Sequence, residues 1–230
     1  MKLRSRDNTR IAAQRLFFCA LFVCAPALAG NRAAPFVGVT FEDTACVGDS
    51  VGNGSGPWDY MERAGLAQSL QLVENHHFTP QVENLVRGQT SPNPVSDIFF
   101  TLTYWPNHHR ALNSLSIYSR RAQARGERLN PPAECWLQRA VSFNPKDATT
   151  RMLYAIHLHR AGHKESAAQE YQTASKLAPS DLFISYNYGL LLFDMNNFEA
   201  AGQMAHKVYS NGFPLPGLRK KLEASGHPVP

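Results

Sequence analysis

The chain has 230 residues, of which 43% are hydrophobic and 18% are charged, and its formal net charge is +5. The first 29 residues hold five of the 23 basic residues and one of the 18 acidic residues, which leaves a nearly neutral remainder of 18 against 17. The excess positive charge therefore belongs to the N-terminal segment, and the rest of the chain lacks the basic surface that nucleic-acid binding requires. About 200 residues are enough for one well-buried domain or a short solenoid.

Residues 1–29 have the order of a secretory signal peptide. Five basic residues within 1–15 precede an apolar run over 16–28, and the small residue Ala29 follows the run. This order predicts export and cleavage after Ala29. An uncleaved anchor is the alternative, but a run of 13 residues interrupted by Pro26 is shorter than the roughly 20 residues that span a bilayer. We therefore expect a mature protein in the bacterial periplasm, without a stable membrane span.

Two of the four cysteines, Cys46 and Cys135, remain after removal of the leader. In the oxidising environment expected for an exported protein, an even pair favours a disulfide. Cys46 lies in a glycine-rich segment, whose conformational freedom a covalent link would reduce. The alternative is two separate thiols, and the sequence leaves both open.

Residues 30–63 contain many glycines and no helical period, which predicts an irregular N-terminal arm. Within it, the aromatic segment 56–60 is expected either to pack against the first helix or to contact a partner. From about residue 64, apolar side chains recur at three- and four-residue spacing, as at Leu66, Leu70 and Val73. This spacing predicts amphipathic helices.

The most informative pattern is an internal repeat, because residues 148–179 and 182–213 superpose at a spacing of 34 residues. The recurring positions are those at which two antiparallel helices approach closely, since small residues admit the neighbouring backbone and large ones fill the space beside them. The matched pairs are Tyr154 and Tyr188, Leu158 and Leu192, Gly162 and Asn196, Ala167 and Ala201, and Ala174 and Val208.

This pattern resembles the tetratricopeptide repeat, strongly over 148–215 and more loosely over 64–146. The unit 182–215 departs from the family at Ala205, where an aromatic residue is usual, and at Phe213, where a proline is usual. The resemblance implies an all-α fold: a short right-handed solenoid of antiparallel helix pairs over 64–224, with an irregular N-terminal arm and a C-terminal capping helix. The expected units are 64–107, 108–146, 148–181 and 182–215, then a capping helix at 216–224 and a tail at 225–230.

In this family, four positions on the first helix of each pair line a concave groove. The resemblance places the following residues there: Arg110, Asn113, Ile117 and Arg120; Thr149, Met152, Ile156 and His159; and Phe183, Tyr186, Leu190 and Phe193. The groove is then expected to be basic at one end and apolar or aromatic at the other, which suits an extended peptide or amphipathic helix of some acidic character. The alternative is that several of these side chains, above all Leu190 and Phe193, are buried against the capping helix.

Histidines cluster at 76–77, at 108–109 and over 157–163. Adjacent helical residues point about 100° apart, and no cysteine or carboxylate lies at a ligand spacing beside them, so we expect no metal site. The sequence has no nucleophile elbow, no phosphate-binding glycine loop and no zinc-protease motif. We therefore expect no cofactor, no catalytic residue and no enzymatic activity.

The function that the resemblance implies is protein-protein interaction, by an exported adaptor or assembly factor whose groove binds a peptide or helix. The alternatives are a permanent structural subunit of an envelope secretion or polysaccharide complex and, last, an enzyme. The strings at 77–80 and 106–112 are similar to those of exported proteobacterial repeat proteins without an assigned activity. The expected partner is a protein or peptide, and not nucleic acid.

Overall fold

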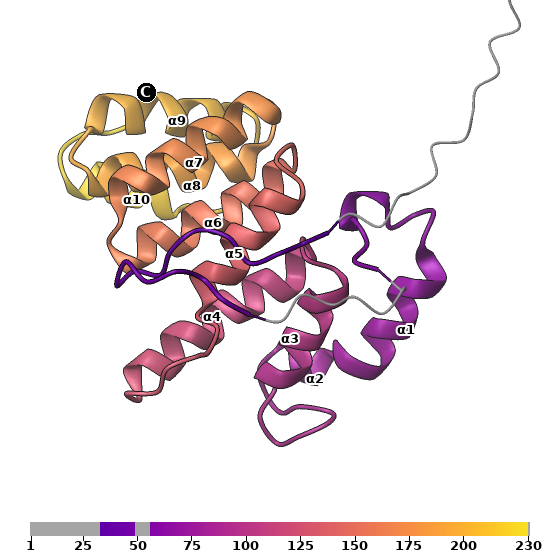
Figure 1. Cartoon of the computed structure of the whole chain (residues 1–230). Helices are drawn as coiled ribbons and strands as arrows, with labels where there is room; N and C mark the ends of the chain where they lie inside the picture. Colours follow the sequence, from indigo (N-terminus) through magenta and orange to yellow (C-terminus); the bar gives the residue numbers. More distant parts are fainter. Residues whose placement is uncertain (1–32, 49–55, 230) are drawn as a thin grey trace, which may run out of the picture. The chain divides into compact units, whose positions relative to one another are not determined.

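The computed structural model describes residues 33–48 and 56–229, so the predicted leader and its cleavage site lie outside the described part. Within these ranges the chain forms ten α-helices, one 3₁₀-helix and a single isolated β-bridge, between Val39 and Ala45 (Figure 1). The elements are η1 (Tyr60–Glu62), α1 (Ala67–His77), α2 (Pro80–Glu83), α3 (Val95–Tyr104), α4 (His109–Ala124), α5 (Ala133–Phe143), α6 (Ala148–Ala161), α7 (Lys164–Leu177), α8 (Leu182–Asp194), α9 (Phe198–Ser210) and α10 (Gly217–Ala224). In the described part, no helix is both long and apolar enough to cross a membrane.

The helices form pairs that follow the predicted repeat. The two regular units are α6 with α7 and α8 with α9, and α7 also packs against α8 (Figure 1). Small residues allow this approach: Ala155, Ala167 and Ala201 are completely buried, and a Cβ placed on Gly189 would lie 3.0 Å from the Cβ of Met204. The prediction of an all-α, tetratricopeptide-type solenoid is thereby confirmed.

Side chains and backbone at the helix ends fix where these pairs begin and turn. Asp147 accepts the Thr150 N–H at 3.1 Å at the start of α6, and Asp181 accepts the Phe183 N–H at 2.8 Å at the start of α8. Both satisfy a backbone donor that has no partner within the helix. Gly162 ends α6 with a φ of 92°, a conformation that glycine adopts without a steric penalty.

The first two units are less regular than the last two. In the second unit, residues 125–132 separate α4 from α5. In the first unit, α1 and α3 are separated by a longer connection that includes the short helix α2. Asp97 is fully buried beneath that connection, accepts the Gln89 N–H at 2.7 Å and the Thr90 N–H at 3.2 Å, and lies 2.9 Å from His77 Nδ1. This carboxylate gives the connection a defined path.

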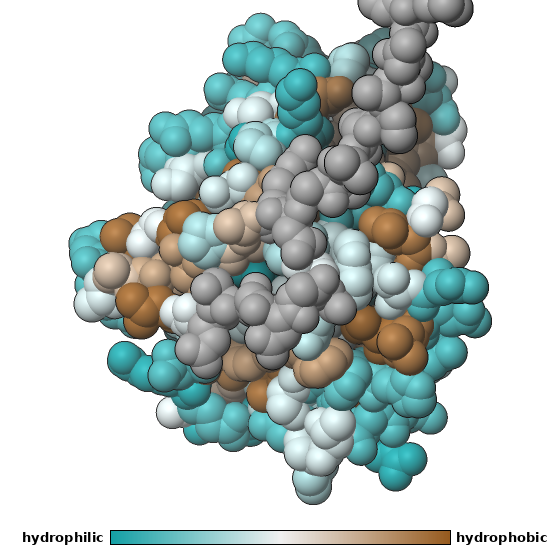
Figure 2. All heavy atoms as spheres, turned by 45° about the vertical axis from the view of Figure 1, so that its right-hand side comes forward, coloured by the Kyte–Doolittle hydropathy of each residue, from teal (hydrophilic) through white to brown (hydrophobic). Residues whose placement is uncertain are grey.

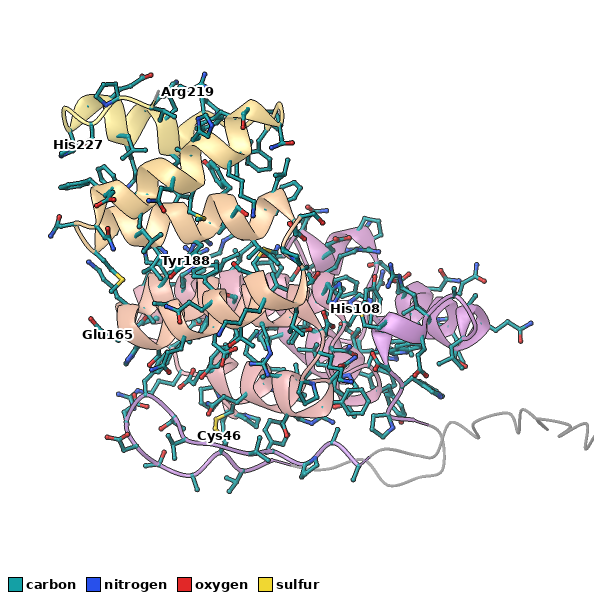
Figure 3. All side chains as sticks on the ribbon, turned by 90° about the horizontal axis from the view of Figure 1, so that it is seen from above. Cys46, His108, Glu165, Tyr188, Arg219 and His227 are labelled. Atoms are coloured by element: carbon teal, nitrogen blue, oxygen red, sulfur yellow. A yellow bond between two sulfur atoms is a disulfide. The ribbon has the colours of Figure 1, made fainter. Side chains whose placement is uncertain are left out.

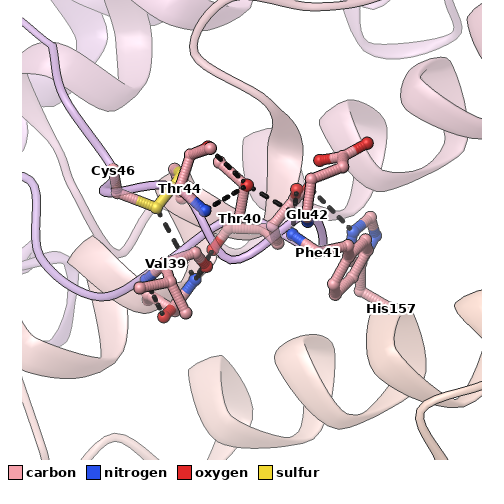
Figure 4. Close-up of a disulfide and its surroundings, with 10 residues drawn as sticks. Val39, Thr40, Phe41, Glu42, Thr44, Cys46 and His157 are labelled. Atoms are coloured by element: carbon pink, nitrogen blue, oxygen red, sulfur yellow. Dashed lines mark hydrogen bonds and ion pairs between the residues drawn. A yellow bond between two sulfur atoms is a disulfide. The ribbon is translucent and has the colours of Figure 1, made fainter.

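The described part of the arm, residues 33–48, lies along α5 (Figures 1 and 3). A disulfide joins Cys46 to Cys135 at the start of α5, with the two Cα atoms 5.5 Å apart. One turn further along α5, Gln138 donates a hydrogen bond to the Val39 carbonyl at 2.7 Å (Figure 4). Residues 33–48 contain no helix, and these contacts determine where they run, whereas the 3₁₀-helix η1 lies within the segment 30–63 that the sequence predicts to be irregular.

Arg139 on α5 holds the arm and the end of α3 together. Its side chain is almost fully buried, and it donates to the carbonyls of Ala34 at 2.6 Å, Leu102 at 2.7 Å and Thr103 at 3.3 Å. Leu102 and Thr103 lie in the last turn of α3, where the helix dipole favours a positive charge. Burial lowers the pKa of Arg139 to about 10, so the guanidinium stays charged at neutral pH.

The aromatic segment 56–60 packs against the first unit, which was one of the two predicted roles. Trp58 lies 5.4 Å from Trp105, measured between ring centroids. Tyr60 of the segment forms a buried cluster with Trp105 and with Val73 of α1, and Trp58 packs against this cluster. This segment therefore packs against α1 and the C-terminal end of α3.

His108 caps α4 and is completely buried at the middle of the structure (Figure 3). Its Nδ1 accepts the Ala111 N–H at 3.1 Å, so the proton of the neutral ring is on Nε2, which lies 3.0 Å from Glu74 Oε1. A second proton on Nδ1 would remove the cap. Burial lowers the pKa of His108 in spite of the adjacent Glu74, which raises it.

We expect the free energy of unfolding to fall as the pH is lowered below about 6.5, by up to about 1.4 kcal/mol per pH unit for this one group. The sign follows from the lowered pKa of His108, because the unfolded chain then binds a proton that the folded protein does not. Urea unfolding at several pH values measures the slope. His108→Asn retains a capping oxygen and does not titrate, so it should show a smaller slope. Equal slopes in both proteins would contradict the assignment.

Candidate functional site

The predicted groove residues of α4 and α6 lie on two first helices that contact each other. Asn113 is exposed, and Ile117, Thr149, Met152 and Ile156 are each half-buried. Their exposed parts are available to a ligand without any rearrangement of the helices. Whether a partner binds this surface stays a prediction.

Arg110 does not supply the free positive charge that the sequence predicts for the groove. Its guanidinium binds Glu83 through two hydrogen bonds, at 2.8 and 2.6 Å, and Glu74 at 3.2 Å. It also lies over the ring of Phe78, 5.3 Å from its centroid. The prediction fails because the packing of α1 and α2 brings Glu74 and Glu83 beside Arg110, and the helical spacing of α4 does not reveal that packing.

Arg120, unlike Arg110, has no carboxylate within ion-pair distance among the described residues. Its side chain is half-buried, and its Nε has no hydrogen-bond partner among the described residues. Burial lowers the pKa of Arg120, and the nearby cations Arg160 and Arg121 lower it further. The uncompensated charge is therefore at the C-terminal end of α4.

At the α8 end, the capping helix α10 covers most of the predicted groove. Tyr186 is only 8% exposed, with its ring 4.9 Å from that of Phe213, so its prediction as a binding residue is wrong. Leu190 and Phe193 pack into the apolar cluster formed with α10, in agreement with the alternative of burial against the cap. Only Phe183 projects from this end, with 57% of its surface exposed.

His159, also predicted for the groove, is engaged by an acidic side chain. Its Nε2 lies 3.0 Å from Asp194 Oδ2, and the second oxygen of Asp194 binds Lys221 of α10 at 2.8 Å. Burial lowers the pKa of His159 although Asp194 raises it, so the ring is neutral at pH 7. This contact ties α6 to the end of α8 and to the cap, which is a structural role.

A cavity of about 760 Å³ lies between the arm, the C-terminal ends of α4 and α6, and residues 125–132. Phe41 of the arm forms one wall, with its ring stacked on those of His163 at 4.2 Å and His157 at 5.6 Å (Figure 4). Arg120 and Arg160 line the same cavity. The sequence does not predict this site, because the arm has no periodicity that reveals where it docks.

Two buried titratable side chains, Glu134 and His157, also line the cavity. His157 Nδ1 is 3.0 Å from Ser116 Oγ, and its Nε2 is 3.9 Å from Glu134 Oε2 and has no hydrogen-bond partner among the described residues. Burial raises the pKa of Glu134, but His157 and the Phe41 N–H outweigh it and hold that pKa below its ordinary range. Ser116 is buried and does not line the cavity, so its hydroxyl is not placed to attack a substrate.

Comparison with known proteins gives similarity of fold only. No protein-family model matches the chain, and no curated protein matches it. The crystal structure of MamA protein is 15% identical, with 70% of this chain and 84% of that one covered and a TM-score of 0.47. A tetratricopeptide repeat protein from Parabacteroides merdae is 19% identical, with coverages of 67% and 57% and a TM-score of 0.46.

A third structure is that of YrrB, described as a TPR protein with an unusual peptide-binding site. It is 16% identical, with 73% of this chain and 90% of that one covered, and its TM-score is 0.39. Similarities of this size do not define a site. The evidence for the fold is the set of helix pairs and their 34-residue repeat in the chain itself.

Proposed function

We propose that the protein is an exported interaction module that binds an extended peptide or a short helix of a partner protein. The observation that carries the proposal is the row of exposed and half-buried side chains on the first helices α4 and α6, which includes Asn113, Ile117, Met152 and Ile156. Apolar side chains that are already fixed on rigid helices can bind a ligand at a low entropic cost. Phe183 on α8 occupies one of the groove positions that the sequence predicts on the first helices, and its side chain is exposed.

Export is the second part of the proposal. It is supported by the basic and apolar segments of residues 1–29 and by the disulfide between Cys46 and Cys135, since disulfides persist in oxidising compartments. A mature form that begins at Gly30, identified by mass spectrometry of the protein from its host, is the expected product. We propose the periplasm as its location.

A permanent structural subunit is a second candidate, and the exposed apolar side chains of the first unit favour it. Leu72 is 64% exposed and Val86 is 72% exposed. On the face drawn in Figure 2, apolar residues form several separate patches among polar ones. Separate exposed apolar patches suit a subunit that contacts several neighbours.

The test is site-specific photo-crosslinking in the host envelope. A photoreactive residue at Asn113 or Phe183 should give one discrete adduct, because both side chains are exposed on first helices. The matched control is Leu177, a 40% exposed apolar residue on the second helix α7, which should give none. Adducts from Leu177 and Leu72 as strong as those from Asn113 would support the structural subunit. Adducts from Leu177 and Leu72, with none from Asn113 or Phe183, would reject the proposed surface.

A further inference from the structure

Three arginines and three glutamates line the cavity beside the arm, and these side chains differ in whether they have a partner of opposite charge. Four of its charged neighbours form pairs: Glu42 lies 3.9 Å from Arg128, and Glu127 binds Arg125 at 2.7 Å. Arg120 and Arg160 have no carboxylate within ion-pair distance in the described part of the chain, although both line the cavity. Outside these pairs the lining has one further carboxylate, that of Glu134, which accepts the Phe41 N–H at 3.2 Å and lies 3.9 Å from His157 Nε2.

Two buried nitrogen atoms at this cavity lack a hydrogen-bond acceptor among the described residues. They are Arg120 Nε and His157 Nε2, and His157 is only 4% exposed. When His157 Nδ1 accepts the Ser116 hydroxyl proton, Nε2 carries the ring proton and is a donor, a tautomer that the carboxylate of Glu134 favours. A buried donor without a partner costs stability, so an acceptor bound in the cavity would relieve that cost.

We propose that this cavity is a binding site for a carboxylate-bearing ligand, held by Arg120 and Arg160 with His157 Nε2 as a further donor. A planar carboxylate matches the two parallel N–H groups of a guanidinium. A carboxylate brings one negative charge to Arg120 and Arg160, whereas a phosphate dianion would bring two and be repelled more strongly by Glu134. Phe41 and Leu129 supply apolar walls for the carbon atoms of the ligand. The inference goes beyond partner binding and does not depend on it.

The carboxylate has two sources to distinguish, a free organic acid and an acidic side chain of a peptide. Calorimetric titration of the disulfide-bonded mature protein would use N-acetylglycine for the first and a capped peptide with one central glutamate for the second, with inorganic phosphate as a third probe. Saturable binding of either carboxylate, tighter than that of phosphate, supports the proposal and identifies the source. Tighter binding of phosphate, or no saturation by any probe in the millimolar range, would overturn it.

Substitutions locate the binding. Arg120→Gln and Arg160→Gln should each lower the affinity for the carboxylate probe by about tenfold to a hundredfold, because each removes a charge-assisted hydrogen bond. Arg121→Gln is the matched control: it removes the same charge from the adjacent, exposed position, which does not line the cavity, and should leave affinity within about twofold. If the half-buried Arg120→Gln variant unfolds at a lower temperature than the wild type, the affinity of the exposed Arg160→Gln variant is the test of the site. An equal loss in Arg121→Gln would show general charge attraction and reject the site.

Discussion

Replacing Cys46 and Cys135 together by alanine should lower the free energy of unfolding by about 4 to 5 kcal/mol. The disulfide closes a long loop, since the two residues are 89 positions apart, and the unfolded chain without it regains the corresponding conformational entropy. Alanine is suitable because both cysteines are buried. Urea unfolding of the variant and of the oxidised wild type measures the difference.

Two controls accompany this measurement. Wild-type protein treated with a reductant should lose about as much stability as the double variant, and mass spectrometry of the untreated protein should show both thiols consumed. A double variant as stable as the oxidised wild type would mean that the arm is held by its other contacts alone. Two free thiols in the exported protein would contradict the bond itself.

Arg139→Met should lower the free energy of unfolding by about 3 to 5 kcal/mol, the range for removing one member of a buried charged interaction. Methionine has a similar length and can fill the space, but it leaves the carbonyls of Ala34, Leu102 and Thr103 without their donor. Arg139→Lys keeps the charge but not the planar group that reaches three carbonyls, so an intermediate loss is expected. Chemical denaturation of the wild type, Arg139→Met and Arg139→Lys measures the three free energies of unfolding.

The matched control for Arg139 is Arg121→Met, since Arg121 is exposed at the end of α4. A surface substitution of this kind usually changes stability by less than about 0.5 kcal/mol. If Arg139→Met were no less stable than Arg121→Met, water would have to satisfy the three carbonyls in place of the guanidinium. That result would remove Arg139 as the link between the arm and α3.

The helix pairs are predictable from the sequence because their contacts are local and periodic. Ala167 and Ala201 are buried one repeat apart, and the 34-residue spacing alone indicates that both are buried. The same periodicity says which side of a helix a residue occupies, but not what covers that side. It therefore places Tyr186 in the groove although α10 buries it, and it leaves Arg110 free although two glutamates bind it.

The cavity is not predictable, for a different reason. Its walls come from the arm, from residues 125–132 and from the helices α4, α5 and α6, and only the helices follow a repeat. The position of Phe41 depends on the hydrogen bond to Glu134 and on a disulfide, neither of which has a periodic signature. The cysteine pair is the one signal in the sequence that points to the arm.

The attachment of the arm to α5 also bears on the order of folding. Its hydrogen bonds to Gln138, Glu134 and Arg139 join residues 93 to 105 positions apart, whereas each of the two regular helix pairs closes within one 34-residue repeat. Contacts between distant parts of a chain form slowly, because a long loop has to close first. The helix stack can therefore assemble before the arm docks. The cavity, which has Phe41 as a wall, is then completed in the last step of folding.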